Sequence, residues 1–174
     1  MPLPRNESPD DSLRAHGITI RDSAESLRSE QLDGIESSLK LRLPGEYRSF
    51  LLRANGGVPE PRLFHYIAID EDEGTRSRQK GKIAWFYPAT PADWGSGILI
   101  SPLTFYQHNV PLGFPDWLLP IANVENALEG GMLCIAIKGE NQGQIYYFPE
   151  QEIGEDTLHH VADSFNSFLT LLGK

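Results

Sequence analysis

The stretch LPGEYRSFLLRANGG at residues 43–57 carries the clearest structural signals of the chain. Its Leu-Pro pair favours a new helix, because the residue before proline avoids the helical region and proline suits the first helical position. Apolar side chains then recur at the spacing of one helix face, at Tyr47, Phe50, Leu51 and Ala54. Asn55, Gly56 and Gly57 can take the positive φ that closes a helix. The stretch predicts a helix that packs by one face and stops at glycine.

A second helix is predicted directly upstream. Apolar residues recur there at helical spacing, at Leu32, Ile35 and Leu39. Ser29 offers an N-cap and Glu30 a negative charge in the first turn. The two helices should form a hairpin. Residues 1–17 are rich in proline and acids and poor in apolar side chains, so we expect a flexible arm there and a single domain over residues 18–174.

The rest of the chain is typical of short strands followed by one helix. β-prone runs occupy residues 63–69, 82–87 and 97–108. Runs at 131–138 and 144–149 are joined by GENQG, which predicts a tight hairpin. The last helix should have Asp163 as its cap, Gly173 at its end and an apolar face of Phe165, Phe168, Leu169 and Leu172. The pattern predicts an α+β domain with a mainly antiparallel sheet, on which the N-terminal helical hairpin and the C-terminal helix pack.

Composition excludes several classes of protein. The 174 residues include one cysteine and carry a formal net charge of -9. One cysteine cannot form an internal disulfide framework, and Cys134 lies in an apolar run that predicts a buried thiol. The net charge disfavours nucleic acid as a direct ligand. With neither a long apolar run nor a secretory signal, we expect a cytoplasmic protein that does not enter a membrane.

The motifs offer little chemistry. The stretch at 70–82 has two acids at EF-hand spacing, but Gly81 stands where the bidentate glutamate belongs; four acids followed by four bases are better explained by a solvated hairpin tip whose halves attract one another. Ser96 lacks the flanking glycines of a nucleophile elbow. His159 and His160 would point to opposite faces of a strand and cannot readily share a metal. We therefore expect no enzyme activity, no cofactor and no metal.

Aromatic residues in the middle of the chain allow two interpretations. They are Trp85, Phe86, Trp94, Phe105, Tyr106, Phe114 and Trp117. Their spacing in β-prone segments favours core packing, and a small apolar cleft among them is the alternative.

Acidic residues concentrate near the C-terminus. Residues 111–174 contain 2 basic and 9 acidic side chains. An acidic surface can steer a basic protein towards itself. The candidate contacts are Glu125, Glu129, Glu140, Glu150, Glu152, Glu155 and Asp156. The alternative is that these acids only keep the domain soluble.

With these residues set out, the chain resembles the SUKH superfamily, which groups bacterial toxin-immunity proteins with fungal cell-wall regulators of the Smi/Knr type. The resemblance begins at IESSLKLRLPGEYRSFLLRANGG (residues 35–57) and resumes at LLPIAN (118–123), at GMLCIAIKGENQGQIYYF and at VADSFNSFLTLL (161–172). Residues 61–117 match only in strand-like texture. The resemblance implies an α+β fold and, for bacterial members, binding to a cognate toxin.

Two functions follow as hypotheses. The first is a non-enzymatic immunity protein that binds and neutralises a cognate toxin through the acidic last third of the chain. The toxin would be basic, and a nuclease is one such toxin. The alternative is a regulatory or scaffold module that binds a cellular protein, as the resemblance to the fungal branch implies. Fold-level likeness supports the class of protein more strongly than its partner.

Overall fold

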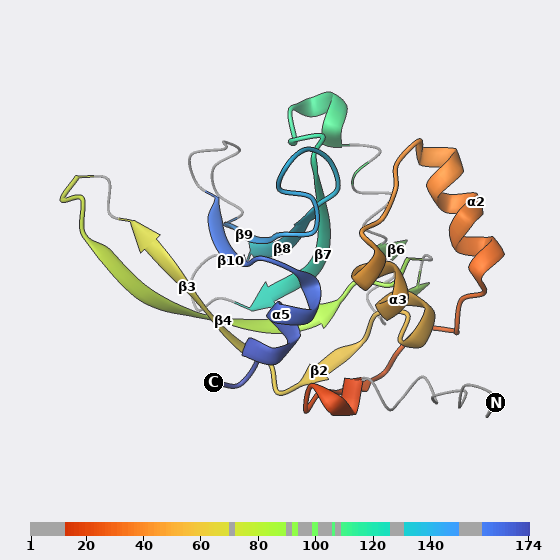
Figure 1. Ribbon diagram of the computed structural model, residues 1–174, viewed down its shortest axis with the longest axis horizontal. Coiled ribbons are helices and arrows are strands. Elements are labelled where there is room, and N and C mark those ends of the chain that lie inside the picture. The colour runs from red at the N-terminus through yellow and green to blue at the C-terminus, as the bar shows by residue number, and fades with distance from the viewer. Residues whose placement is uncertain are drawn as a thin grey trace, which may run out of the picture.

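The computed structural model describes residues 13–69, 72–89, 92–93, 99–100, 106, 109–125, 131–149 and 158–174. Its centre is a six-stranded antiparallel sheet with the order β10-β9-β8-β7-β4-β3 (Figure 1). The strands are β3 (Leu63–Ile69), β4 (Arg76–Phe86), β7 (Leu118–Glu125), β8 (Gly131–Ala136), β9 (Ile145–Pro149) and β10 (His159–Ala162). The α+β class and the antiparallel sheet predicted from the sequence are confirmed.

Two small antiparallel sheets accompany the large one. The first pairs β1 (Thr19–Arg21) with β2 (Val58–Glu60), and the second pairs β5 (Ala92–Asp93) with β6 (Leu99–Ile100). The strand predicted over residues 97–108 thus includes β6, while most of that range lies outside the described residues. No helix in the described part of the chain is long and apolar enough to cross a membrane.

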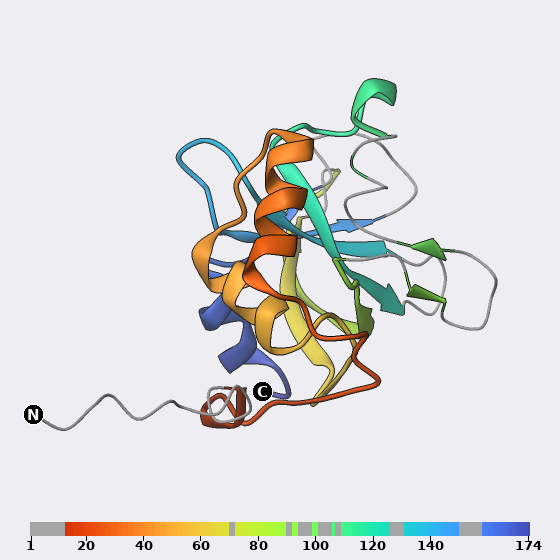
Figure 2. The same ribbon diagram turned by 90° about the vertical axis from the view of Figure 1, so that its right-hand side faces the viewer.

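The helices α2 (Ser29–Leu39), α3 (Gly45–Arg53) and α5 (Phe165–Leu171) lie on one side of the large sheet (Figure 2). The short 3-10 helix η1 (Val110–Leu112) lies on the other side. The predicted helical hairpin and the C-terminal helix packed on the sheet are therefore confirmed. The cap of α5 is corrected: Ser164, not Asp163, is the N-cap, and its hydroxyl oxygen accepts a hydrogen bond from the Ser167 amide at 3.2 Å.

The main core lies between the helices and the sheet. Phe50 of α3 is its junction, with ring centroids 5.0 Å from Phe165 of α5 and 5.1 Å from Phe86 of β4. Strand β8 is buried along its whole length and alternates between two clusters, because successive side chains point to opposite faces. Leu133 and Ile135 enter the main core. Cys134, fully buried, joins a smaller cluster on the opposite face.

The chain is already packed within the segment expected to be an arm. Leu13 is 6% exposed and belongs to the main core, and residues 13–15 are helical. The Ile18 amide donates to the Leu13 carbonyl at 3.0 Å and so closes the turn at residues 16–17, directly after the short helix. The packed domain therefore reaches back at least to Leu13; residues 1–12 lie outside the described residues.

Asn55 connects three segments that are far apart in the sequence. Its side-chain Nδ2 donates to the Glu25 carbonyl at 2.8 Å, and its Oδ1 accepts from the Ala89 amide at 2.8 Å. Its own carbonyl accepts from the Ala24 amide at 3.1 Å. Asn55 is 1% exposed and is the one buried polar or charged residue found among the described residues. The asparagine thus holds the N-terminal segment and the segment that follows β4 against the helical hairpin.

The glycines after Asn55 have a different role from the one predicted. Both have positive φ, +72° at Gly56 and +117° at Gly57, but α3 already ends at Ala54, whose φ of -140° is extended. A Cβ on Gly56 would lie 2.7 Å from the Phe86 carbonyl oxygen, and one on Gly57 would lie 2.6 Å from the Arg21 carbonyl oxygen. The glycines are needed because the backbone passes between β4 and β1, not because they close the helix.

Replacing Asn55 should therefore destabilise the whole domain. We expect Asn55→Ala to lower the free energy of unfolding by about 2–4 kcal/mol, because a buried amide and a buried carbonyl lose their partner. Urea unfolding followed by circular dichroism measures this. The control is Asn141→Ala in the exposed β8–β9 turn, which should change stability by no more than about 0.5 kcal/mol. Equal costs in the two variants would contradict the role given to Asn55.

Candidate protein-binding surface

Two of the seven predicted contact residues, Glu125 and Glu140, lie in the described part of the chain. The others are outside it: Glu129, Glu150, Glu152, Glu155 and Asp156. Glu125 ends β7 and Glu140 lies in the turn between β8 and β9. The two therefore belong to different parts of the surface, and their environments differ.

Glu125 already has two cationic neighbours. Its Oε2 lies 2.7 Å from Lys82 Nζ, and its Oε1 lies 3.6 Å from Arg62 Nη1. The strand register accounts for the closer pair, since Lys82 of β4 stands directly opposite Glu125 of β7. The hydrogen bond from Lys82 holds the pKa of the Glu125 carboxyl below its ordinary value. Part of its charge is thus already neutralised within the domain.

The turn that contains Glu140 borders an acidic hollow through Gln142 and Gly143. The hollow has a volume of about 200 Å³ and lies where the β8–β9 turn meets the starts of α3 and α5. It is lined by Pro44, Gly45, Glu46, Gln142, Gly143, Asp163, Ser164 and Phe165. Its two charged lining residues are both acids. Glu46 accepts a hydrogen bond from the Asn166 amide at 2.8 Å, and Asp163 lies 3.1 Å from His160 Nε2. The GENQG hairpin predicted from the sequence is present between β8 and β9, and its Gln142 and Gly143 form one side of the hollow.

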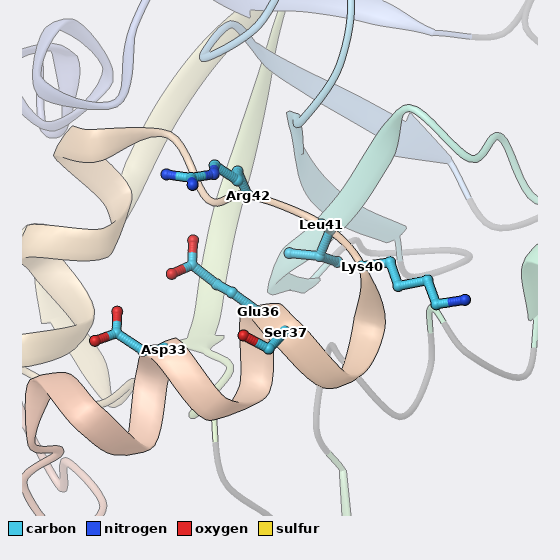
Figure 3. Close-up of a pocket in the computed structure, with 6 residues that line it drawn as sticks. All are labelled: Asp33, Glu36, Ser37, Lys40, Leu41 and Arg42. Carbon is cyan, nitrogen blue, oxygen red and sulfur yellow. The ribbon is translucent and has the colours of Figure 1, made fainter.

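A larger hollow, of about 510 Å³, lies beside the loop between α2 and α3 (Figure 3). Asp33 and Glu36 project from the same side of α2, whereas Lys40 extends away from them. The Glu36 carboxylate accepts from the Leu43 amide at 2.6 Å and from Arg48 Nε at 3.3 Å, and Arg48 also pairs with Asp33. These groups are occupied in holding the Leu-Pro loop, which makes the hollow a structural feature.

The histidine pair behaves as the strand pattern predicts. His159 is half-buried, with its ring 5.1 Å from Tyr66 and 6.2 Å from Tyr147, and burial lowers its pKa. His160 is exposed on the opposite face. No group of three or more His, Cys, Asp or Glu side chains in the described ranges is arranged to hold a metal ion.

The aromatic residues that the structure describes are mainly packing groups. Phe86 is fully buried, Phe114 is 6% exposed and Tyr106 is 9% exposed. The Tyr106 hydroxyl donates to the Asp116 carbonyl at 2.7 Å. Trp94 and Phe105 lie outside the described residues.

The thiol of Cys134 is fully buried. Burial raises the pKa of this thiol, which disfavours the reactive thiolate.

One surface was missed by the sequence reasoning. Strands β3 and β4 form a long hairpin at one side of the molecule (Figure 1). Its described acids, Asp72 and Glu73, lie in the turn, whereas the bases lie along β4 opposite apolar and histidine residues of β3. The bases are thus paired with β3 rather than with the acids of the turn, of which Asp70 and Glu71 lie outside the described residues; the attraction between the two halves stays a prediction. Alternation in LFHYIAI and RSRQKGK was the signal that could have shown this face.

Together these features define an α+β domain whose described charged groups lie on the surface, in hollows and along a hairpin, around a core closed by Asn55. The sequence matches the model of the SMI1 / KNR4 family (SUKH-1) over residues 26–171. The chain belongs to that family. A search of curated proteins found no significant match.

The match places the Asn-Gly-Gly segment, the large sheet and the whole of α5 inside the family domain. The middle of the chain, which resembled the superfamily only in texture, is included as well.

The ion pairs of Glu125 generate a pH-dependent prediction. Because its folded pKa is lowered from the ordinary 4.5, the pair stabilises the fold above that pH and loses its contribution as pH falls through the folded pKa. At neutral pH and low salt, Glu125→Gln should cost about 0.2–1 kcal/mol, since exposed pairs are weak.

Unfolding of this variant should be measured by urea titration at several pH values. Its deficit relative to wild type should disappear in acid and shrink in high salt. Glu140→Gln is the control and should show no such deficit at any of these pH values. A Glu125→Gln deficit that persists in acid would contradict the ion-pair explanation.

Proposed function

We propose that this chain is a non-enzymatic immunity protein that binds and neutralises a cognate bacterial toxin. Membership of the SMI1 / KNR4 family (SUKH-1) supports a role in binding another protein. The acidic last third of the sequence favours a basic partner, such as a nuclease that must hold phosphate. In this proposal the protein acts by covering the toxin's active site.

The acidic hollow beside the β8–β9 turn is the observation that carries the proposal. Its carboxylates, Glu46 and Asp163, come from the starts of α3 and α5, and Glu140 lies on the adjoining turn. An arginine or lysine side chain of the partner would find carboxylates there. The hollow lies between segments that the core holds in place, because Phe165 is buried against Phe50. Little reorganisation would be needed on binding.

The alternative is a regulatory or scaffold module that binds a cellular protein. Family membership supports it equally, since the family description names no toxin. Gene context separates the two: a toxin gene directly beside this gene favours immunity, whereas an isolated gene or a eukaryotic source favours regulation. An enzyme is the weakest of the functions considered, since no nucleophile, base and orienting group come together among the described residues.

The immunity proposal can be tested with the product of the neighbouring toxin gene. We expect a complex whose association rate falls as salt rises, because opposite charges steer the encounter. Replacing Glu140 and Asp163 together, as Glu140→Gln and Asp163→Asn, should lower the association rate by about twofold to fivefold in low salt. Stopped-flow or surface plasmon resonance measures both effects.

The matched control is Glu25→Gln, an exposed acid of the N-terminal segment, which should leave the association rate unchanged. Absence of a complex with every linked toxin would overturn the immunity proposal. A complex whose association rate ignores salt and both acid substitutions would overturn the acidic surface while leaving inhibition standing.

A further inference from the structure

The outer face of the β3–β4 hairpin combines an apolar row with a basic row. Side chains directly opposite in an antiparallel pair point to the same face. The register therefore places two rows side by side, Leu63, His65, Ile67 and Ile69 on β3 and Lys82, Lys80, Arg78 and Arg76 on β4. We call this surface the basic–apolar face. Each row extends over about 20 Å, from the rise per residue of a strand.

The apolar row is unusually exposed. Five large apolar side chains of the described residues are at least 41% exposed, and three of them belong to this row. Leu63 is 44%, Ile67 48% and Ile69 54% exposed. The opposite face of the same hairpin is buried at its base, where the Phe64 ring lies across Gly81 and leaves no room for a Cβ. The hairpin is thus anchored by one face and presents the other to its surroundings.

The basic row retains most of its charge. Lys82 pairs with Glu125 at the base of the hairpin. In the part of the chain that the structure describes, no carboxylate lies within ion-pair distance of Arg76, Arg78 or Lys80. The neighbouring His65 responds to this environment: desolvation and the nearby Arg78 and Lys80 lower its pKa, which disfavours a positive charge on its ring. Three cations therefore stand beside three exposed aliphatic side chains.

The open edge of β3 is partly closed. The Gly173 amide donates to the Leu63 carbonyl at 2.8 Å, and the His159 side chain hydrogen-bonds to the Ile67 backbone. His65 hydrogen-bonds to the Lys174 backbone. These contacts oppose the addition of another strand to the edge. A partner would therefore use the face of the hairpin.

We propose that the basic–apolar face binds a protein segment that presents a row of carboxylates beside a row of aliphatic side chains. Charge complementarity selects this occupant. A symmetric pair of copies would bury this face against itself and would supply no carboxylate to Arg76, Arg78 or Lys80. Nucleic acid phosphates could contact the basic row but would leave the aliphatic row uncovered. The face also has no Phe, Tyr or Trp ring on which bases could stack. The net charge of -9 acts weakly on such a partner, because charges beyond about 8 Å are screened at physiological salt.

A bilayer is the competing occupant that shares this chemistry most closely. Interfacial membrane segments usually add Trp or Tyr to their cationic and aliphatic residues. The basic–apolar face has neither, since its eight positions are aliphatic, histidine, lysine or arginine. The observations therefore favour an acidic protein segment over an anionic lipid surface.

The proposal can be tested with a synthetic helical peptide of about 14 residues, whose length of about 21 Å matches the face. One version carries a row of leucines beside a row of glutamates, and a second has lysines in place of the glutamates. Fluorescence anisotropy with the full chain should show binding of the glutamate version at least about tenfold tighter than the lysine version, and weakening in high salt. Carbodiimide coupling followed by mass spectrometry should link the glutamate peptide to Lys80.

Matched variants connect binding to the two rows. Replacing the basic pair, as Arg78→Gln with Lys80→Gln, should weaken the glutamate peptide about tenfold, and Ile67→Ser should weaken it about fivefold. Arg42→Gln and Leu112→Ser remove an exposed cation and an exposed apolar group elsewhere and should leave affinity unchanged. All four are surface changes, so unfolding midpoints should stay near that of wild type.

Three results would overturn the proposal. The first is no binding of the glutamate peptide by the native chain. The second is binding that ignores both the basic-pair and Ile67 substitutions. The third is tight binding to phosphatidylglycerol vesicles that requires the same residues, with weak binding of the peptide, which would assign the face to a membrane surface.

Discussion

Three hydrogen bonds made by Asn55 hold the domain closed. Two come from its side chain and one from its carbonyl, and they reach the N-terminal segment and Ala89, in the segment that follows β4. Burying a side-chain amide costs free energy unless it forms hydrogen bonds. The bonds of Asn55 therefore favour one relative position of the three segments. Gly56 and Gly57 complete it, because the backbone beside them has no room for a Cβ. The helical hairpin can then bring Phe50 against Phe86 and Phe165.

The two candidate binding surfaces are supported by different parts of this core. The acidic hollow is built on the starts of α3 and α5, which the aromatic cluster holds in place. The basic–apolar face lies on a hairpin anchored at its base by Phe64, whose ring packs near Tyr147 and Phe168. One surface has carboxylates at its charged positions and the other has cations. A single small domain can therefore present complementary surfaces to two different partners, with the same packing supporting both.

Local patterns were enough to predict the frame of the fold. Period-3.6 patterns located α2, α3 and α5, and the apolar run around Cys134 with GENQG after it located the β8–β9 hairpin, because these signals act over neighbouring residues. What failed depended on residues distant in the sequence. The need for glycine at Gly56 comes from Phe86. The cap of α5 is a local exception, because it moved by one residue to Ser164, whose partner Ser167 is three residues away. The row that the bases of residues 76–82 form beside β3 was not foreseen, because their register is set by the strand pairing and not by composition.

The same distinction holds for the site. Counting acids gave the net charge of the last third of the sequence but could not foresee that Glu125 would be paired with Lys82 and Arg62, since that depends on which strands become neighbours. Glu46 was not among the predicted contacts because it lies far from the acidic third in sequence and joins Asp163 only through packing of α3 and α5. A charge total predicts solubility and long-range attraction, whereas a binding surface needs the fold.

We propose that two parts of the chain have separate roles: residues 43–57 hold the fold together, and the surface beside the β8–β9 turn binds the partner. Hydrogen-deuterium exchange of the full chain, free and in complex with its partner toxin, tests this directly. We expect slow exchange at the Gly57 and Ala89 amides in both states, because both are hydrogen-bonded within the closed core. New protection should fall on residues 139–143 and on the start of α5. Protection that appears instead along residues 43–57, with none at the turn, would contradict the claim.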